Sequence, residues 1–194
     1  MSIATPEAVH RFWFGELSTA GLASTRARKH WFTPSDVFDA RIAAEFADTV
    51  IAAENQKLDA WRTTPMSWVS YLVVCDQLPR NLWRGSARAF SLDEQARHAA
   101  RLGLAAGLHQ SLGPDEQSFC YMPFMHSEDI LDQYLSVGLF ASLRDRATGT
   151  ARSYAGNSLR HAQQHRDTIL QFGRFPHRNT ALGRPSTPAE RDAL

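Results

Sequence analysis

Four Thr-Pro dipeptides divide the chain, and each places a hydroxyl side chain directly before a proline. A threonine hydroxyl caps the first unpaired N–H groups of a helix, and a proline at the first helical position gives up no hydrogen bond. Each dipeptide therefore predicts a helix start: Thr5-Pro6, Thr33-Pro34, Thr64-Pro65 and Thr187-Pro188. The spacing of a capping box occurs at Thr187 with Glu190, Thr33 with Asp36 and Ser91 with Glu94.

Apolar side chains after these starts recur with helical spacing, for example along one face from Phe38 to Val50. The stretch from Trp68 to Cys75 is apolar on nearly all sides, so its helix should be buried. No stretch alternates in the manner of a strand. The pattern predicts helices over 6–14, 34–55, 65–78, 92–104, 114–122, 127–146, 156–172 and 187–193. A turn or short helix is expected near 176–181, and residues 15–32 leave room for another helix.

These elements predict an all-α fold, a single domain over residues 1–194 that is built of stacked helical hairpins. No 34-residue repeat is visible, so a regular tetratricopeptide array is not indicated. Cys75 and Cys120 lie in apolar surroundings and are expected to be buried thiols without a disulfide.

The formal net charge of +1 provides no broad attraction to nucleic acid or to a membrane surface, and neither partner is predicted. The N-terminus has no basic start followed by an apolar stretch, and no apolar run is long enough to cross a bilayer, which predicts a cytoplasmic protein. Phosphate-binding glycine loops, dinucleotide fingerprints and Cys-x-x-Cys pairs are absent. The sequence therefore identifies no cofactor.

Charge is unevenly distributed along the chain. Residues 102–143 contain five acids and no Lys or Arg, whereas residues 144–184 contain eight Arg and two acids. These segments pair with each other, or the later arginines, with His177, line an anion site; the sequence leaves both open. A second run without acids, from Leu78 to Leu92, holds Arg80, Arg84 and Arg88.

Polar residues follow the buried helix in the stretch Asp76-Gln77-Leu78-Pro79-Arg80-Asn81. Pro79 is expected to end the helix just before it. Asp76 would then lie near a helix C-terminus, where a carboxylate is disfavoured and needs a cationic partner. Arg80 is the nearest one. The alternative is a buried ion pair that only braces the turn.

A second polar stretch runs from Pro123 to Asp129. Ser127 is expected to cap the next helix, with Glu128 in its favourable first turn. His126 lies on a face that begins polar and becomes apolar, which is typical of the rim of a pocket. Plain helix capping is the alternative explanation of the acids.

Two later stretches also carry histidines. His161 and His165 are one helical turn apart, a spacing that can chelate a metal, although a partly exposed histidine pair is the default and no metal site is predicted. In Phe172-Gly173-Arg174-Phe175-Pro176-His177-Arg178-Asn179, Gly173 fits a helix C-cap. The basic residues of the loop should project from an aromatic base, as in many binding loops. The alternative is a tightly packed structural turn.

The chain resembles the uncharacterised bacterial family called domain of unknown function 924. The resemblance covers nearly the whole chain and rests on Phe12-Trp13-Phe14-Gly15, Trp31-Phe32, Asp76 to Asn81, Arg88-Ala89-Phe90, Pro123 to Glu128, Phe172 to Asn179, Leu182-Gly183-Arg184 and Ser186-Thr187-Pro188. It implies a tetratricopeptide-like α-α superhelix and no established activity. Where Leu78 stands, family members often have Phe, which preserves the apolar step.

Together these patterns predict a polar pocket that binds a small, anionic ligand, with catalysis left open. The candidate catalytic residues are His126, Glu128, Asp76 and His177, and the candidate ligand-binding residues are Gln77, Arg80, Asn81, Arg174, Arg178 and Asn179. A histidine beside carboxylate and arginine suits acid–base chemistry near neutral pH. The alternative is an interaction module with a peptide groove that exposes Trp13, Trp31 or Trp83.

Overall fold

The computed structural model describes residues 2–192, which form helices and no strand. This confirms the all-α prediction. The α-helices are α1 Pro6–Phe14, α2 Thr25–Phe32, α3 Asp36–Glu54, α4 Pro65–Leu72, α5 Leu78–Leu82, α6 Asp93–Ala105, α7 Pro114–Met125, α8 Ile130–Arg146, α9 Gly149–Phe172 and α10 Pro188–Asp192. Four short 3-10 segments are η1 Asp59–Thr63, η3 Ala87–Phe90, η4 Leu108–Ser111 and η5 Pro176–Arg178, and η2 Val73–Gln77 is a π-helix.

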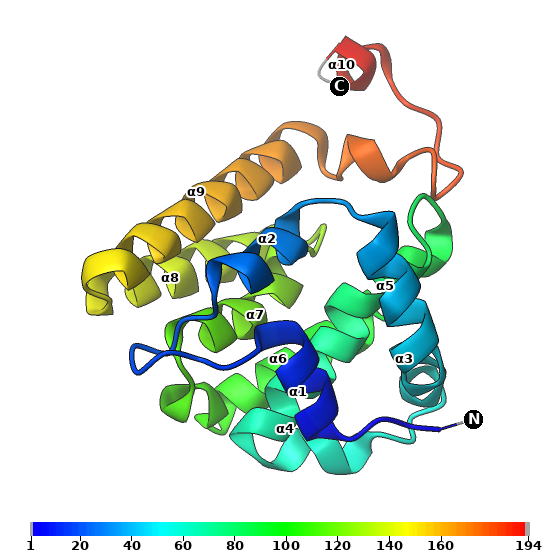
Figure 1. The fold of residues 1–194 in the computed structure, drawn as a ribbon. Coiled ribbons are helices and arrows are strands. Elements are labelled where there is room, and N and C mark those ends of the chain that lie inside the picture. The colour runs from blue at the N-terminus through cyan, green and yellow to red at the C-terminus, as the bar shows by residue number, and fades with distance from the viewer. Residues whose placement is uncertain (1, 193–194) are drawn as a thin grey trace.

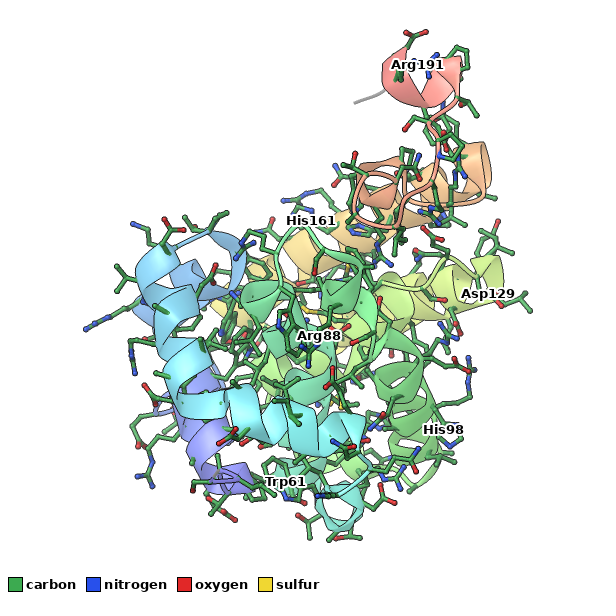
Figure 2. The ribbon with its side chains drawn as sticks, turned by 90° about the vertical axis from the view of Figure 1, so that its right-hand side faces the viewer. Trp61, Arg88, His98, Asp129, His161 and Arg191 are labelled. Atoms are coloured by element: carbon green, nitrogen blue, oxygen red, sulfur yellow. The ribbon has the colours of Figure 1, made fainter. Side chains whose placement is uncertain are left out.

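The helices pack around α7, which contacts α4, α6, α8 and α9. Helices α8 and α9 form a long antiparallel hairpin, and α2 lies between this hairpin and α3 (Figure 1). The α8–α9 pair agrees with the expected helical hairpins, while the tetratricopeptide-like arrangement stays a prediction. The turn of α10 that carries Arg191 stands apart from the main body (Figure 2). Within residues 2–192, no helix combines the length and apolar character needed to cross a membrane.

The stretch from Trp68 to Cys75 is buried throughout, as predicted, and belongs to one contiguous apolar cluster. Cys75 and Cys120 are buried and form no disulfide among the described residues, also as predicted. The indole N–H of Trp68 donates to the carbonyl oxygen of Ala99 at 2.9 Å. Its ring lies so close to Gly103 that a Cβ there would overlap it, so a glycine is required at that position of α6.

Three of the expected helix caps are present. Thr5 accepts from the N–H of Ala8, Thr64 forms a capping box with Ser67, and Thr187 exchanges hydrogen bonds with Glu190.

The expected caps at Thr33 and Ser91 are wrong. Thr33 donates its N–H to the carbonyl of Lys29 and so closes α2, which leaves Ser35 to cap α3. The hydroxyl of Ser91 donates to the carbonyl of Arg88 and closes η3, so α6 has Leu92 before its first turn and no side-chain cap. Thr33 and Ser91 each donate a hydrogen bond to the preceding helical segment, because the connection to the next helix is short.

Pro79 does not end the buried helix, contrary to the sequence expectation. Helix α4 continues through η2 into α5, and the N–H of Leu78 donates to the carbonyl of Val73, five residues back. The wider π-turn changes the hydrogen-bonding pattern of the helix. The helical path therefore continues past Pro79, which has no N–H to donate. Asp76 therefore lies inside a helical run and not at a C-terminus. Such π-turns often occur at functional sites.

Other boundaries differ for identifiable reasons. Helix α9 begins at Gly149, before the expected residue 156, because its buried face there is made of Ala151 and Ala155, which give a weak apolar signal. Asp129, not Ser127, caps α8. Helix α7 passes Pro123 and ends at Met125, and α2 occupies part of the open segment 15–32. Residue 193, the expected end of the last helix, lies outside the described residues.

Candidate functional site

A cavity of about 460 Å³ opens between α2, α5, the end of α7 and α9. Its volume falls within the usual range of small-molecule pockets. One wall carries polar side chains from the end of η2 and from α5 with the turn after it, namely Gln77, Arg80, Asn81 and Arg84. Four histidines, His30, His126, His161 and His165, also line the cavity. Among the described residues that line it there is no carboxylate.

His126 is oriented by a buried carboxylate. Its Nδ1 lies 2.8 and 3.0 Å from Oδ1 and Oδ2 of Asp76. An ionised carboxylate only accepts, so Nδ1 carries the proton and donates it. This arrangement places the other ring nitrogen, Nε2, where no group among residues 2–192 forms a hydrogen bond with it. The pair has the form of the Asp–His dyads that orient an imidazole for proton transfer.

Asp76 is 1 % exposed, and burial alone would raise the pKa of its carboxyl group. The neighbouring His126 and Arg80 outweigh that effect and lower the pKa to about 2. Nη1 of Arg80 lies 3.5 Å from Oδ1 of Asp76, and the amide of Gln77 donates to the same carboxylate. Asp76 is therefore held ionised at neutral pH.

Arg80 is fixed from behind by Asp93, which accepts from Nη1 at 2.8 Å and from Nη2 at 3.0 Å. Arg178 approaches the same carboxylate at 3.4 Å, and its guanidinium lies 4.6 Å from the ring centres of Phe90 and Phe175. Burial, followed by the charge of Arg80, lowers the pKa of Arg178 to about 10, so it remains charged. These contacts hold Arg80 in place in the wall of the cavity.

His165 faces the cavity near His126, with 6.4 Å between the ring centres. Its Nδ1 lies 2.8 Å from the carbonyl oxygen of His161. A carbonyl can only accept, so Nδ1 carries the proton and Nε2 has a lone pair. Burial, followed by the charge of His126, lowers the pKa of His165 to about 4, which keeps the imidazole neutral.

The structure gives no support to metal binding by His161 and His165. Within residues 2–192, no group of three or more His, Cys, Asp or Glu side chains has an arrangement that could hold a metal ion.

The structure brings together part of the predicted site. Gln77, Arg80, Asn81 and His126 line the cavity, and Asp76 lies directly behind His126. The remaining candidates, Glu128, His177, Arg174, Arg178 and Asn179, are not part of the lining.

The candidates outside the lining tie down the C-terminal segment. Glu128 accepts from Arg184 at 2.7 Å and from the N–H of Phe175 at 2.8 Å. Arg184 thus joins the acidic and basic segments of the sequence, as the pairing interpretation expected.

Arg174 has a different partner, the buried carboxylate of Glu190, which accepts at 2.6 and 2.8 Å. Asn179 lies between Ser186 and Glu190, and His177 is exposed. The anion site expected from the loop arginines is therefore not formed by Arg174 and Arg184, because each has a carboxylate of its own.

Sequence reasoning missed several lining residues. Arg84 follows Arg80 by one helical turn within a run without acids, and this spacing was a usable signal. His30 had none, since it lies in the segment 15–32, whose apolar residues show no clear period, and Trp31 was named only in the family resemblance and in the peptide-groove alternative. The peptide-groove alternative expected Trp13, Trp31 or Trp83 to be exposed; Trp13 is buried, whereas Trp31 and Trp83 are half-buried.

Two comparisons with known proteins give matches. The family described as bacterial protein of unknown function (DUF924) matches residues 9–194. The solved structure of a protein of unknown function from Agrobacterium tumefaciens is similar to the chain, with a TM-score of 0.83 and 33% sequence identity. The similarity covers 97% of this chain and 96% of that one. No curated protein matches the sequence.

Proposed function

The chain belongs to the bacterial family of unknown function DUF924, and from its geometry we propose that it binds a small anionic ligand in the cavity and exchanges a proton with it through His126. The observation that carries the proposal is the charge of the side chains that line the cavity. Two arginines and four histidines surround the cavity, whereas the nearby carboxylates of Asp76, Asp93 and Asp39 are placed behind these groups.

The two arginines are presented differently. Arg80 is partly buried and held by Asp93, so its charge is fixed in the wall. Arg84 is half exposed and donates from Nε and Nη2 to the carboxylate of Asp39. Its Nη1 donors have no protein partner among the described residues. A guanidinium with unused donors suits a carboxylate or phosphate group. Asn81 is oriented by the same Asp39 at 2.7 Å.

His126 supplies the proton-transfer group. Nε2 accepts a proton from an acidic X–H bond of the ligand, and the electron pair of that bond stays on the ligand. The imidazolium that forms is stabilised by the ionised Asp76 through Nδ1. The developing negative charge on the ligand lies near the arginines of the wall. General base catalysis of this kind contributes about 10²- to 10⁴-fold to a rate.

The binding step is tested by thermal shift with acetate, benzoate, phosphate and phenyl phosphate. We expect at least one of these anions to raise the Tm of the wild-type protein and to shift Arg84→Gln less. Arg88→Gln is the matched control, because Arg88 makes a similar exposed ion pair, with Glu54 at 2.9 Å, away from the cavity. Equal shifts in the two variants, or no shift by any anion, would remove the proposal.

The proton-transfer step is tested with His126→Gln, which keeps a polar side chain at the same position. Acetate and benzoate carry no acidic X–H bond at neutral pH, so a proton that Nε2 takes up beside them must come from the buffer and should appear as a buffer-dependent heat in calorimetry. The variant should bind with a heat that does not depend on the buffer. An unchanged buffer dependence in His126→Gln would exclude this imidazole as the proton-transfer group.

A further inference from the structure

The cavity has two chemically different ends. The polar groups Gln77, Arg80, Asn81 and Arg84 all come from one helical run and the turn after it. Trp31, Phe32, Met122 and Ser158, from α2, α7 and α9, line another, mostly apolar part of the cavity, here called the apolar wall. The same four residues also border a small adjoining hollow of about 10 Å³, which none of the four polar groups reaches. The apolar wall therefore extends away from Arg80 and Arg84, toward a hollow that is also bordered by Arg28, which is paired with Asp115.

Resting on the anion-binding function proposed above, we infer that the ligand is an organic anion that carries an aromatic ring. Its charged group lies against Arg84 and Asn81, and its ring lies between the α2 aromatics and Met122. Inorganic phosphate or acetate would satisfy only the first of these walls and would leave the second in contact with water.

The apolar wall is held in place before a ligand arrives. The indole N–H of Trp31 donates to the carbonyl of Trp13 at 2.9 Å, and its ring makes edge contacts with Phe14 and Phe119 at centre distances of 5.8 and 4.8 Å. A preformed aromatic surface binds a ring without a large cost of ordering. Met122 is buried beside it, and a thioether makes favourable contacts with ring edges.

Phe32 is the exception in this wall because 65% of it is exposed. It follows Trp31 directly, with 6.0 Å between the ring centres, and it lines the mouth of the cavity together with Pro34. A large aromatic side chain at the edge of a pocket can cover the apolar part of a bound ligand. Ser158, on the facing helix α9, is small and leaves the space that a ring would occupy.

The experiment compares matched ligands by calorimetry. Benzoate against acetate and phenyl phosphate against phosphate test the ring, and benzyl alcohol tests the charge. We expect the aromatic anion of a pair to bind about 10-fold or more tighter than its small counterpart, and benzyl alcohol not to bind measurably. Ser158→Phe should fill the apolar end and remove the preference, whereas Ser158→Ala should retain it. Phe32→Ala, at an exposed position, provides a second variant and should weaken benzoate more than acetate.

The outcomes separate this inference from the function on which it rests. Equal affinities within each pair, both reduced in Arg84→Gln, would overturn the aromatic ligand and leave anion binding in place. Benzyl alcohol binding as tightly as benzoate, or no binding by any anion, would overturn both. An aromatic preference that survives Ser158→Phe and Phe32→Ala would overturn the assignment of the apolar wall.

Discussion

Arg178 donates from Nη2 to the backbone carbonyl of His126 at 2.8 Å. This bond connects the C-terminal segment to the residue after α7, although the two are 52 positions apart in the sequence. The imidazole of His126 is therefore fixed twice: through its ring by Asp76 and through its backbone by Arg178. The loop residues that do not line the cavity contribute to it by positioning this one side chain.

Replacing Arg178 with Met should strongly destabilise the fold. The guanidinium is buried between Phe90 and Phe175, and its loss would leave the carbonyl of His126 without this donor and would remove a cation beside Asp93. Breaking a buried charged contact of this kind costs about 3–5 kcal/mol. The free energy of unfolding from urea denaturation measures it.

The control for this variant is Arg88→Met. Arg88 is also paired with a carboxylate, that of Glu54, but both side chains are partly exposed. Exposed ion pairs contribute about 0–1 kcal/mol, so this variant should stay close to the wild-type stability. Equal losses in the two variants would show that Arg178 has no special structural role.

Asp76→Asn should lower stability at neutral pH and lower it less in acid. The folded protein holds the pKa of Asp76 at about 2, below its ordinary value of 3.8. A carboxyl group whose pKa is depressed by folding stabilises the fold above its unfolded pKa and loses this contribution as the pH falls toward the folded value. The difference in unfolding free energy between wild type and variant should therefore shrink from pH 5 to pH 2. A difference that does not change with pH would contradict the ionised state of Asp76.

The centre of the candidate site could be predicted from the sequence because it contains a charged residue next to an otherwise apolar helix. Asp76 follows a helix that is apolar on all sides, and a carboxylate there needs partners, which turned out to be His126 and Arg80. The π-turn that points Asp76 toward His126 left no such signal. It depends on how the chain around Pro79 packs, and the local sequence favoured a helix end instead.

The partners of the arginines in the loop after α9 do not follow from the sequence, for a different reason. Arg174 and Arg184 lie in a run without acids, yet each finds a carboxylate from a distant part of the chain, Glu190 or Glu128. Charge runs in a sequence do not show which tertiary partner neutralises them. The helices themselves were predicted well, since caps and apolar periodicity act within a few residues, whereas ion pairs across loops depend on the whole fold.

Gly103→Ala should destabilise the protein although alanine favours helices. The added Cβ would overlap the indole ring of Trp68, which is fully buried and hydrogen-bonded to Ala99. Overpacking a core in this way costs about 1–3 kcal/mol. Gly138→Ala in α8 is the control, because no atom lies within 4 Å of its added Cβ, and it should stabilise by about 0.5–1 kcal/mol. A loss of the same size in both variants would place the effect in the helices and not in the contact with Trp68.

His165→Gln should make the stability of the protein less sensitive to mild acid. Folding lowers the pKa of His165 from its ordinary value of 6.5 to about 4, so the unfolded chain binds more protons between these values. The free energy of unfolding must then fall as the pH decreases from 6.5 to 4. This loss is complete once the pH is below both pKa values. In the variant this part of the slope should be missing, as measured by urea denaturation at pH 7, 6, 5 and 4.

His98→Gln is the control, because His98 is exposed on a part of the surface well away from His161 (Figure 2). An NMR titration that places the pKa of His165 near 6.5, or an unchanged slope in His165→Gln, would show that the imidazole is not held neutral in the cavity wall.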